Sequence, residues 1–272
     1  MIKNIVFSGG GFNCWAYIGC LRALEEHRSV FDIEQIIGVS AGSSFGLCYL
    51  LGIKWDFLLG FFLNLNFKEL YDIDIDNILI QQSLFAGKKF TELIKEIFRY
   101  RIDPDITFKE LKYYSKIKFT VNALNITNGI LDYFNYDLTP DVKVIDAIRA
   151  SSNLPGIFPP YCINNNFYYD GGICNNCPIE LLDEIDSIAF DLSFSTKTFN
   201  SDMKLFDLFN CLMSIVGKKK QINENIYKLL DDTFKTETLN LNQTKDDIFN
   251  IYMHGYINSK NIIFKNHIAL KN

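Results

Sequence analysis

The feature that most constrains this chain is a pattern that occurs twice near its N-terminus. Each time, a short apolar run typical of a strand leads into a glycine-containing turn and then into apolar residues at helical spacing. The first unit spans Ile5–Leu24 and turns at Gly9-Gly10-Gly11, and the second spans Gln35–Leu51 and turns at Gly38-Val39-Ser40-Ala41-Gly42. Two such units predict parallel strands joined by crossover helices, and therefore a sheet covered on both faces.

The rest of the chain adds strands and helices to the same unit. Asn128-Gly129 is typical of a tight turn between two strands, Phe167–Tyr169 and Ser187–Asp191 are strand-like, and the pattern turns mainly helical after about residue 200. The 272 residues are 48% hydrophobic and contain no linker rich in proline or serine, which suits one large core. We expect a single domain over 1–272, with a core of about residues 4–195 and a mainly helical part of about 200–272.

Charge and cysteine content narrow the partners and the compartment. A net charge of −5 and a pI of about 5.3 argue against affinity gained by neutralising phosphates, so we expect no nucleic-acid partner. Seven scattered cysteines and the lack of a leader-like N-terminal stretch predict an intracellular, cytoplasmic protein. Lys54 and Asp56 interrupt the most apolar stretch, so we expect no transmembrane segment.

The turn Gly38-x-Ser40-x-Gly42 has the pattern of a nucleophile elbow. Small flanking residues let such a serine occupy a strained strand-to-helix turn that lifts its hydroxyl above the edge of the sheet. The helix that starts behind it directs backbone N–H groups toward an oxyanion. The alternative interpretation of this five-residue pattern is a plain turn in which Ser40 is the N-cap of the helix.

Gly9-Gly10-Gly11 also lies between a strand and a helix, so its exposed amides suit an anion. That anion is either the oxyanion of an acyl-transfer intermediate or a nucleotide phosphate. The nucleotide alternative is weaker, because Cys14 replaces the third glycine of the dinucleotide fingerprint and the second strand ends without an acidic residue for the ribose.

A general base for Ser40 must come from elsewhere in the chain. Asp170 follows a strand and precedes Gly171-Gly172, where the backbone turns away tightly and leaves the carboxylate at the strand end. His254 and His267 follow in the order Ser, Asp, His of an α/β-hydrolase, but an elbow at residue 40 comes early for that fold. Asp170 is therefore the favoured candidate, and an ordinary Asp-Gly turn is its alternative.

The glycine loop at 9–11, Gly-x-Ser-x-Gly at 38–42 and Asp-Gly-Gly at 170–172 follow one another in this order. Ser151–Pro160, a loop with three prolines, and Asn176-x-Pro178 accompany them. Together these motifs resemble the patatin-like phospholipase family, and the resemblance covers about residues 4–195.

The resemblance implies a three-layer α/β/α sandwich with a mainly parallel central sheet and a Ser-Asp dyad that needs no histidine. Carried over by position, Ser40 is the nucleophile, Asp170 is its base, and the amides of Gly9, Gly10 and Gly11 form the oxyanion hole. The implied activity is that of a phospholipase A-type lipid acyl hydrolase, which releases fatty acid from membrane phospholipids or other glycerolipids through an acyl-enzyme. It implies no metal, no cofactor and peripheral contact with a membrane, and leaves an activating protein partner open.

One departure from the family pattern motivates a different function. The glycine loop of the family is usually followed by a basic residue and a glycine, where this chain has Asn13 and Cys14. Because backbone amides build the hole, this change need not abolish activity. The alternative is a catalytically weak or silent lipid- or partner-binding module on the same fold.

Two further segments have a structural and a functional interpretation. Trp55–Leu65 is more apolar than a helix with one buried face requires. We hypothesise that part of it borders the acyl groove and acts as a lid or docking patch, whereas the alternative is a helix buried on all sides. Cys174-x-x-Cys177 is interpreted as two free thiols, since no second pair with metal-ligand spacing follows.

Overall fold

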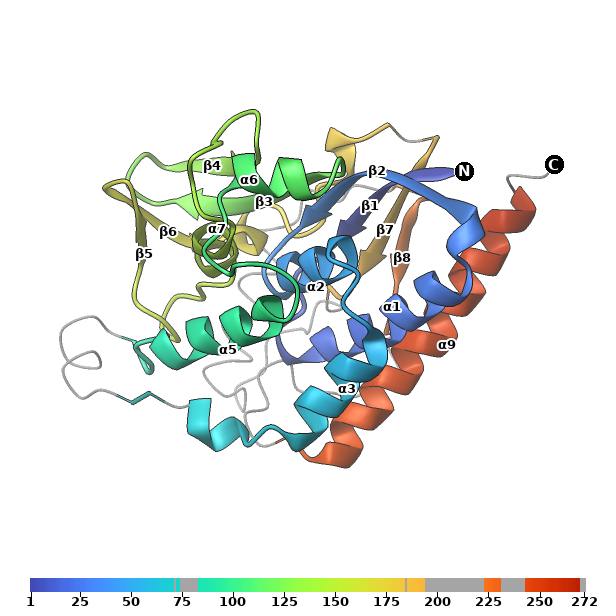
Figure 1. Cartoon of the computed structure of the whole chain (residues 1–272), viewed down its shortest axis with the longest axis horizontal. Coiled ribbons are helices and arrows are strands. Elements are labelled where there is room, and N and C mark those ends of the chain that lie inside the picture. Colours follow the sequence, from blue (N-terminus) through green and yellow to red (C-terminus); the bar gives the residue numbers. More distant parts are fainter. Residues whose placement is uncertain (71, 74–82, 184, 194–222, 231–242, 270–272) are drawn as a thin grey trace, which may run out of the picture.

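A mixed β-sheet forms the centre of the computed structural model, which describes residues 1–70, 72–73, 83–183, 185–193, 223–230 and 243–269 (Figure 1). The strands are β1 (Ile2–Phe7), β2 (Phe31–Gly38), β3 (Lys118–Asn125), β4 (Ile130–Phe134), β5 (Tyr161–Ile163), β6 (Asn166–Asp170), β7 (Ser187–Asp191) and β8 (Ile226–Lys228). Their order is β5-β6-β3-β2-β1-β7-β8, and β4 pairs with β3. The strands β3, β2, β1, β7 and β8 run parallel, whereas β4, β5 and β6 make the antiparallel pairs at one end.

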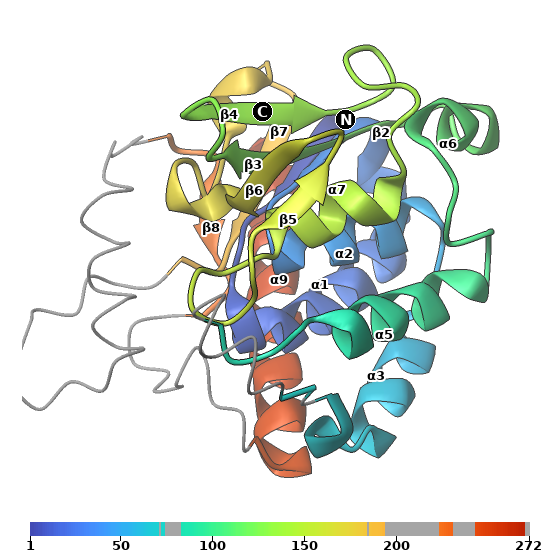
Figure 2. The same cartoon turned by 90° about the vertical axis from the view of Figure 1, so that its left-hand side faces the viewer.

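Helices cover the sheet in two tiers on one side. They are α1 (Trp15–Glu26), α2 (Ala41–Leu50), α3 (Trp55–Asn64), α5 (Lys88–Arg99), α6 (Phe108–Tyr114), α7 (Val144–Ser151) and α9 (Lys245–Ala269). Figures 1 and 2 show α2 and α7 next to the strands, α9 alongside α1, and α3 and α5 farther out. Among the described residues, no helix combines the length and the apolar content needed to cross a membrane.

Both faces of the sheet are buried, as apolar runs without alternation predict. In β1, Ile5 and Phe7 belong to the main core beneath the helices, whereas Val6 points to the opposite face. That second face is covered by the segment around the short helix η5 (Ile179–Leu181), and its apolar cluster consists of Val6, Ile37, Ile179, Leu182 and Ala189. A second short helix, η4 (Gly171–Ile173), follows β6 directly.

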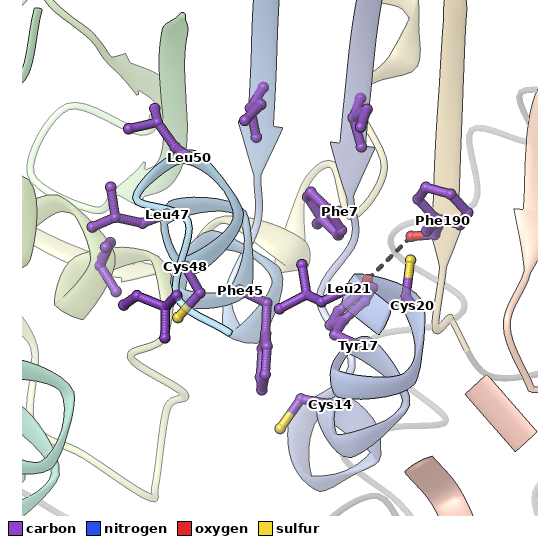
Figure 3. Packing of buried hydrophobic residues seen from close by; sticks show 14 of the residues in the cluster. Phe7, Cys14, Tyr17, Cys20, Leu21, Phe45, Leu47, Cys48, Leu50 and Phe190 are labelled. Carbon is purple, nitrogen blue, oxygen red and sulfur yellow. Dashed lines mark hydrogen bonds between the residues drawn. The ribbon is translucent and has the colours of Figure 1, made fainter. Parts of the chain in front are cut away.

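Tyr17 of α1 connects this helix to the ends of two strands. Its ring lies edge-on to Phe7 with centroids 5.3 Å apart (Figure 3). Its buried hydroxyl lies 2.7 Å from the carbonyl oxygen of Ser8 and 3.1 Å from that of Phe190, and it donates to these two acceptors. These contacts hold the start of α1 against the carboxyl ends of β1 and β7, where the glycine loop leaves the sheet.

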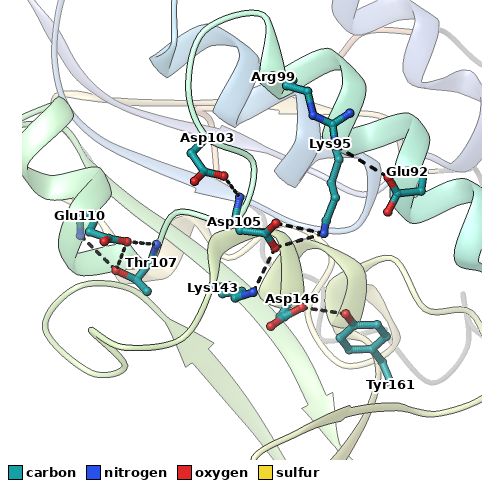
Figure 4. Close-up of polar contacts among 10 residues, drawn as sticks. All are labelled: Glu92, Lys95, Arg99, Asp103, Asp105, Thr107, Glu110, Lys143, Asp146 and Tyr161. Atoms are coloured by element: carbon teal, nitrogen blue, oxygen red, sulfur yellow. Dashed lines mark hydrogen bonds and ion pairs between the residues drawn. The ribbon is translucent and has the colours of Figure 1, made fainter.

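An ion-pair cluster holds α5 to the body of the protein. The Asp105 carboxylate lies 3.1 Å from Lys95 Nζ of α5 and 3.1 Å from Lys143 Nζ, the residue before α7 (Figure 4). The hydrogen bond from Lys95, followed by that from Lys143, lowers the pKa of Asp105.

Thr107 and Glu110 form a capping box at the start of α6.

The predicted fold class is confirmed: the sheet is mainly parallel, has helices on both sides, and the last described residues form the helix α9. The hairpin at Asn128-Gly129 is also confirmed, since it joins β3 to β4 and Gly129 has φ +69°. In the predicted helical part after residue 200, α9 is helical, but Ile226–Lys228 is the strand β8. Residues 194–222 and 231–242 of the chain lie outside the described residues.

Candidate active site

Ser40 lies at the apex of the turn that joins β2 to α2, as the elbow pattern predicts. Its backbone has φ 52° and ψ −128°, a conformation that residues other than glycine rarely adopt. Neither flanking glycine has room for a side chain: a Cβ at Gly38 would collide with the backbone of Ser43, and one at Gly42 with the carbonyl oxygen of Phe7. The Gly-x-Ser-x-Gly pattern is therefore required by close packing of this turn.

Hydrogen bonds from buried groups hold the elbow in place. The backbone N–H of Ser40 donates to Ser151 Oγ at 2.8 Å, and Ser151, at the end of α7, is fully buried. Ser43 Oγ donates to the carbonyl oxygen of Ser40 at 2.5 Å. Both backbone groups of Ser40 are therefore bound, and the side chain is the group of this turn that can react with a ligand.

Asp170 ends β6 and faces Ser40, although the two are far apart in the sequence. The Ser40 side chain lies close enough to the Asp170 carboxyl to lower its pKa, and the Gly172 amide donates to Oδ1 at 2.7 Å. The Asp170 backbone N–H donates to the carbonyl oxygen of Asn153 at 3.0 Å. The side chain is only 3% exposed.

This burial decides the charge of the carboxyl group. Desolvation raises the pKa of Asp170 from 3.8 to about 7, and the Ser40 side chain and the Gly172 amide offset only part of the shift. A carboxyl with such a pKa can both accept and return a proton near neutral pH.

The glycine loop passes next to Ser40, but its three amides are not equivalent. The N–H of Gly9 donates to Asn176 Oδ1 at 3.1 Å, so this amide is already bound within the protein and is not the free oxyanion donor expected from the sequence. Within the part of the chain that the structure describes, the N–H groups of Gly10 and Gly11 donate to no protein acceptor. Gly11 also lines the cavity beside Ser40, so its N–H is the donor of the loop that a ligand in the cavity can reach, and Gly10 is the residue next to it.

A cavity of about 180 Å³ extends from Ser40 between the helices. Apart from Ser40, Ser44 and Ser152, its wall is made of apolar or weakly polar residues from the segment 11–15, from α2, α3 and α5, from the segments 67–70 and 154–158, and from Phe85. The aromatic and aliphatic residues of this wall include Phe12, Trp15, Phe45, Leu58, Phe62, Phe67, Leu70, Phe85, Phe90, Leu93, Ile94, Ile97, Phe98, Leu154, Ile157 and Phe158. Such a wall suits a hydrocarbon chain whose polar end lies at Ser40.

The apolar stretch Trp55–Leu65 forms α3 and the C-cap residue that follows it, and it borders this cavity. Leu58 and Phe62 are buried in the cavity wall, whereas Phe57 and Phe61 are partly exposed. The helix is thus not buried on all sides. Its role as a lid or docking patch stays a hypothesis.

The other candidates from the sequence lie outside this arrangement. His27 Nδ1 lies 3.0 Å from the carbonyl oxygen of Ala23, so it caps α1. His254 is exposed on α9, and His267 belongs to the last turns of the same helix. Cys174 and Cys177 are free thiols, as interpreted from the sequence.

Sequence reasoning missed the residues that hold the two catalytic candidates. Ser151 and Asn153 bind the backbones of Ser40 and Asp170, and both are fully buried. They belong to Ser151–Pro160, which the sequence analysis gives as one of the motifs shared with the family but without a role for any of its residues. A serine at the C-terminal end of α7 was the available signal for the first contact. The second contact uses the backbone carbonyl of Asn153, which any residue type supplies, so the sequence carried no signal for it.

Comparison with known proteins gives the family. A family model described as patatin-like phospholipase matches residues 5–183. Over 194 residues the chain is 34% identical to the probable lipid hydrolase 463L of Invertebrate iridescent virus 6, covering 66% of this chain and 62% of that protein. Over 178 residues it is 27% identical to lysophospholipase NTE1 of Meyerozyma guilliermondii, covering 65% of this chain and 11% of that protein.

A solved structure supports the fold. The crystal structure of VipD from Legionella pneumophila superposes with a TM-score of 0.62 at 15% identity, covering 97% of this chain and 67% of that one. With respect to the two relatives named above, this chain spans less than two thirds of the length of the viral lipid hydrolase and a small part of the length of the lysophospholipase. The match of the family model to most of the chain, on a fold of this kind, shows that the chain belongs to the patatin-like phospholipase family.

Proposed function

We propose that this chain is a lipid acyl hydrolase with Ser40 as nucleophile and Asp170 as base. The observation that carries the proposal is a serine in a strained elbow that faces a buried carboxyl with a pKa of about 7 and borders an apolar cavity. General bases work best when their pKa lies near the operating pH. Membership of the patatin-like phospholipase family supports a hydrolase.

In the acylation step, the Asp170 carboxylate accepts the proton of the Ser40 hydroxyl while Oγ attacks the carbonyl carbon of an ester. The amides of Gly10 and Gly11 stabilise the negative charge that develops on the carbonyl oxygen. The N-terminus of α2, which begins at Ala41, contributes its positive dipole end. When the intermediate collapses, the departing alcohol oxygen takes the proton from Asp170 and the acyl group stays on Ser40.

Deacylation repeats the proton transfer with water. Asp170 accepts a proton from a water molecule, whose oxygen attacks the carbonyl carbon of the acyl-enzyme. The bond to Ser40 Oγ breaks, fatty acid leaves, and the proton returns to Ser40. One carboxyl group serves both steps because its pKa of about 7 makes either protonation state accessible.

The cavity supports a substrate with a long acyl chain, such as a membrane phospholipid or another glycerolipid. The acyl chain fits the apolar wall, and the ester lies where the polar groups of Ser40 and the glycine loop meet. The names of two relatives, a lipid hydrolase and a lysophospholipase, agree with this class. Peripheral contact with a membrane would bring the lipid to α3, whose partly exposed face lies beside the cavity.

The test is release of fatty acid from a labelled phospholipid by the full chain and by Ser40→Ala. We expect release by the wild type, none above background by Ser40→Ala, and a fluorophosphonate adduct on Ser40 of the wild type. Equal background in both proteins, with no adduct, would refute the proposal. If the wild type binds vesicles of the same phospholipid under those conditions, the lipid-binding module is the better description.

A further inference from the structure

The side chain of Asn176 pairs with Gly9 in the way that a neighbouring strand would. Its Oδ1 accepts the Gly9 N–H at 3.1 Å, and its Nδ2 donates to the Gly9 carbonyl oxygen at 3.0 Å. Nδ2 also lies 3.0 Å from Ser193 Oγ, to which it donates. The amide group thus binds both backbone polar atoms of a single residue in the glycine loop.

This pairing begins where the sheet stops. The ladder between β1 and β7 ends at Phe7, and one further bond joins the Ser8 N–H to the carbonyl oxygen of Phe190. Gly9 is the next residue, and no strand of the described part of the chain pairs with it. Asn176 therefore replaces the missing strand at the position where β1 turns into the glycine loop.

Asn176 also lies between the two halves of the site. A Cβ at Gly9 would collide with Asn176 Oδ1 and would lie 3.0 Å from the Cβ of Ser40. A Cβ at Gly172 would lie 2.5 Å from the same Asn176 oxygen and 3.0 Å from Asp170 Oδ1. The side chain of Asn176 is thus packed between the glycine loop next to the nucleophile and the turn that binds the base.

We propose that Asn176 is a positioning residue that holds the glycine loop so that the amides of Gly10 and Gly11 point at the oxyanion. The Gly9 carbonyl shares its peptide plane with the Gly10 N–H, so the bond from Asn176 to that carbonyl fixes the direction of the Gly10 N–H. The bond from the Gly9 N–H to Asn176 holds the preceding peptide plane, and both planes must be held for the chain to present the Gly11 N–H next to Ser40. This inference rests on the proposed hydrolase. Its consequence for catalysis is a contribution in the transition state, where charge appears on the oxygen, and little contribution to binding of the neutral ester.

The test compares Asn176→Ala with Asn175→Ala in the full chain. Asn175 is the adjacent residue of the same type, but its side chain donates to Glu180 instead. Two readouts are needed: hydrogen–deuterium exchange of the peptide that covers residues 8–14, and kcat and KM for ester hydrolysis. Melting temperatures establish that both variants are folded.

In Asn176→Ala we expect faster exchange over residues 8–14 and a kcat lower by about 100-fold, the scale measured for loss of one oxyanion donor, with KM close to that of the wild type. Asn175→Ala should match the wild type in both readouts. Unchanged exchange in a folded Asn176→Ala overturns the inference whether or not the chain hydrolyses esters. Faster exchange together with a wild-type kcat overturns the role of Asn176 in catalysis. If the wild type shows neither activity nor a Ser40 adduct, the proposed function is refuted, and the exchange result alone decides whether Asn176 positions the glycine loop.

Discussion

Replacing Asp170 by Asn should lower turnover and raise stability at the same time. The substitution keeps the size of the side chain and removes the carboxylate that the proposed mechanism uses as a base. Removing a general base costs on the order of 10²–10⁴ in rate, so we expect kcat to fall by about a thousandfold. The same substitution removes a buried carboxyl that is costly to ionise.

The size and sign of the stability effect follow from the pKa of Asp170, which is 3.8 as its ordinary value and about 7 in the folded protein. Between these two pH values the folded wild type keeps a proton that the unfolded chain has lost, so its stability falls as pH rises. A shift of this size corresponds to about 4 kcal/mol in total. The asparagine side chain of the variant is neutral at every pH, so the variant escapes this loss, which is complete above about pH 7.

The assay is urea unfolding of the wild type and Asp170→Asn at about pH 5 and about pH 8. Contributions of all other titrating groups cancel in the difference between the two proteins. We expect the variant to gain about 3 kcal/mol in unfolding free energy relative to the wild type between these two conditions. In parallel, kcat/KM of the wild type should rise with pH through about 7, because the base must be unprotonated.

Two results would refute this reasoning. A difference in unfolding free energy that does not change with pH means that the folded protein does not protonate Asp170. Turnover of Asp170→Asn near that of the wild type, together with a folded but inactive His254→Ala, replaces the dyad with a histidine triad. Asp132→Asn, on the strand β4 that also pairs with β3, is the matched control for turnover.

Two further predictions concern the cavity. Phe62→Glu should lower the unfolding free energy by several kcal/mol, because this side chain is only 6% exposed and lies in the cavity wall. Phe61→Glu should keep the melting temperature of the wild type and weaken co-sedimentation with phospholipid vesicles. A large loss of melting temperature in both variants would exclude docking through α3. Cys48→Phe should fill the cavity two turns along α2 from Ser40 and reduce kcat/KM for long-chain esters more than for short-chain esters, and equal loss for both chain lengths would contradict an acyl site there.

Several helices, strands and turns of this fold can be predicted from local residue patterns, and at least one strand cannot. The elbow and the Asn128-Gly129 hairpin depend on backbone conformations that few residue types allow, so their residues identify them. The helix α5 also carries a local signal, because Leu93, Ile94, Ile97 and Phe98 recur at helical spacing. The strand β8 has three residues, too few for a periodic signal.

The sequence alone determined the chemistry available to this protein: a serine that can occupy a strained turn, glycines that allow close approach, and a carboxyl at a strand end. These are local properties of residue types and their neighbours. Only the tertiary structure decided that Asp170 meets Ser40, because strand order is set by packing of the whole core. It also decided that Asp170 titrates near 7, since burial sets that value, and that Asn176 already occupies the amide of Gly9.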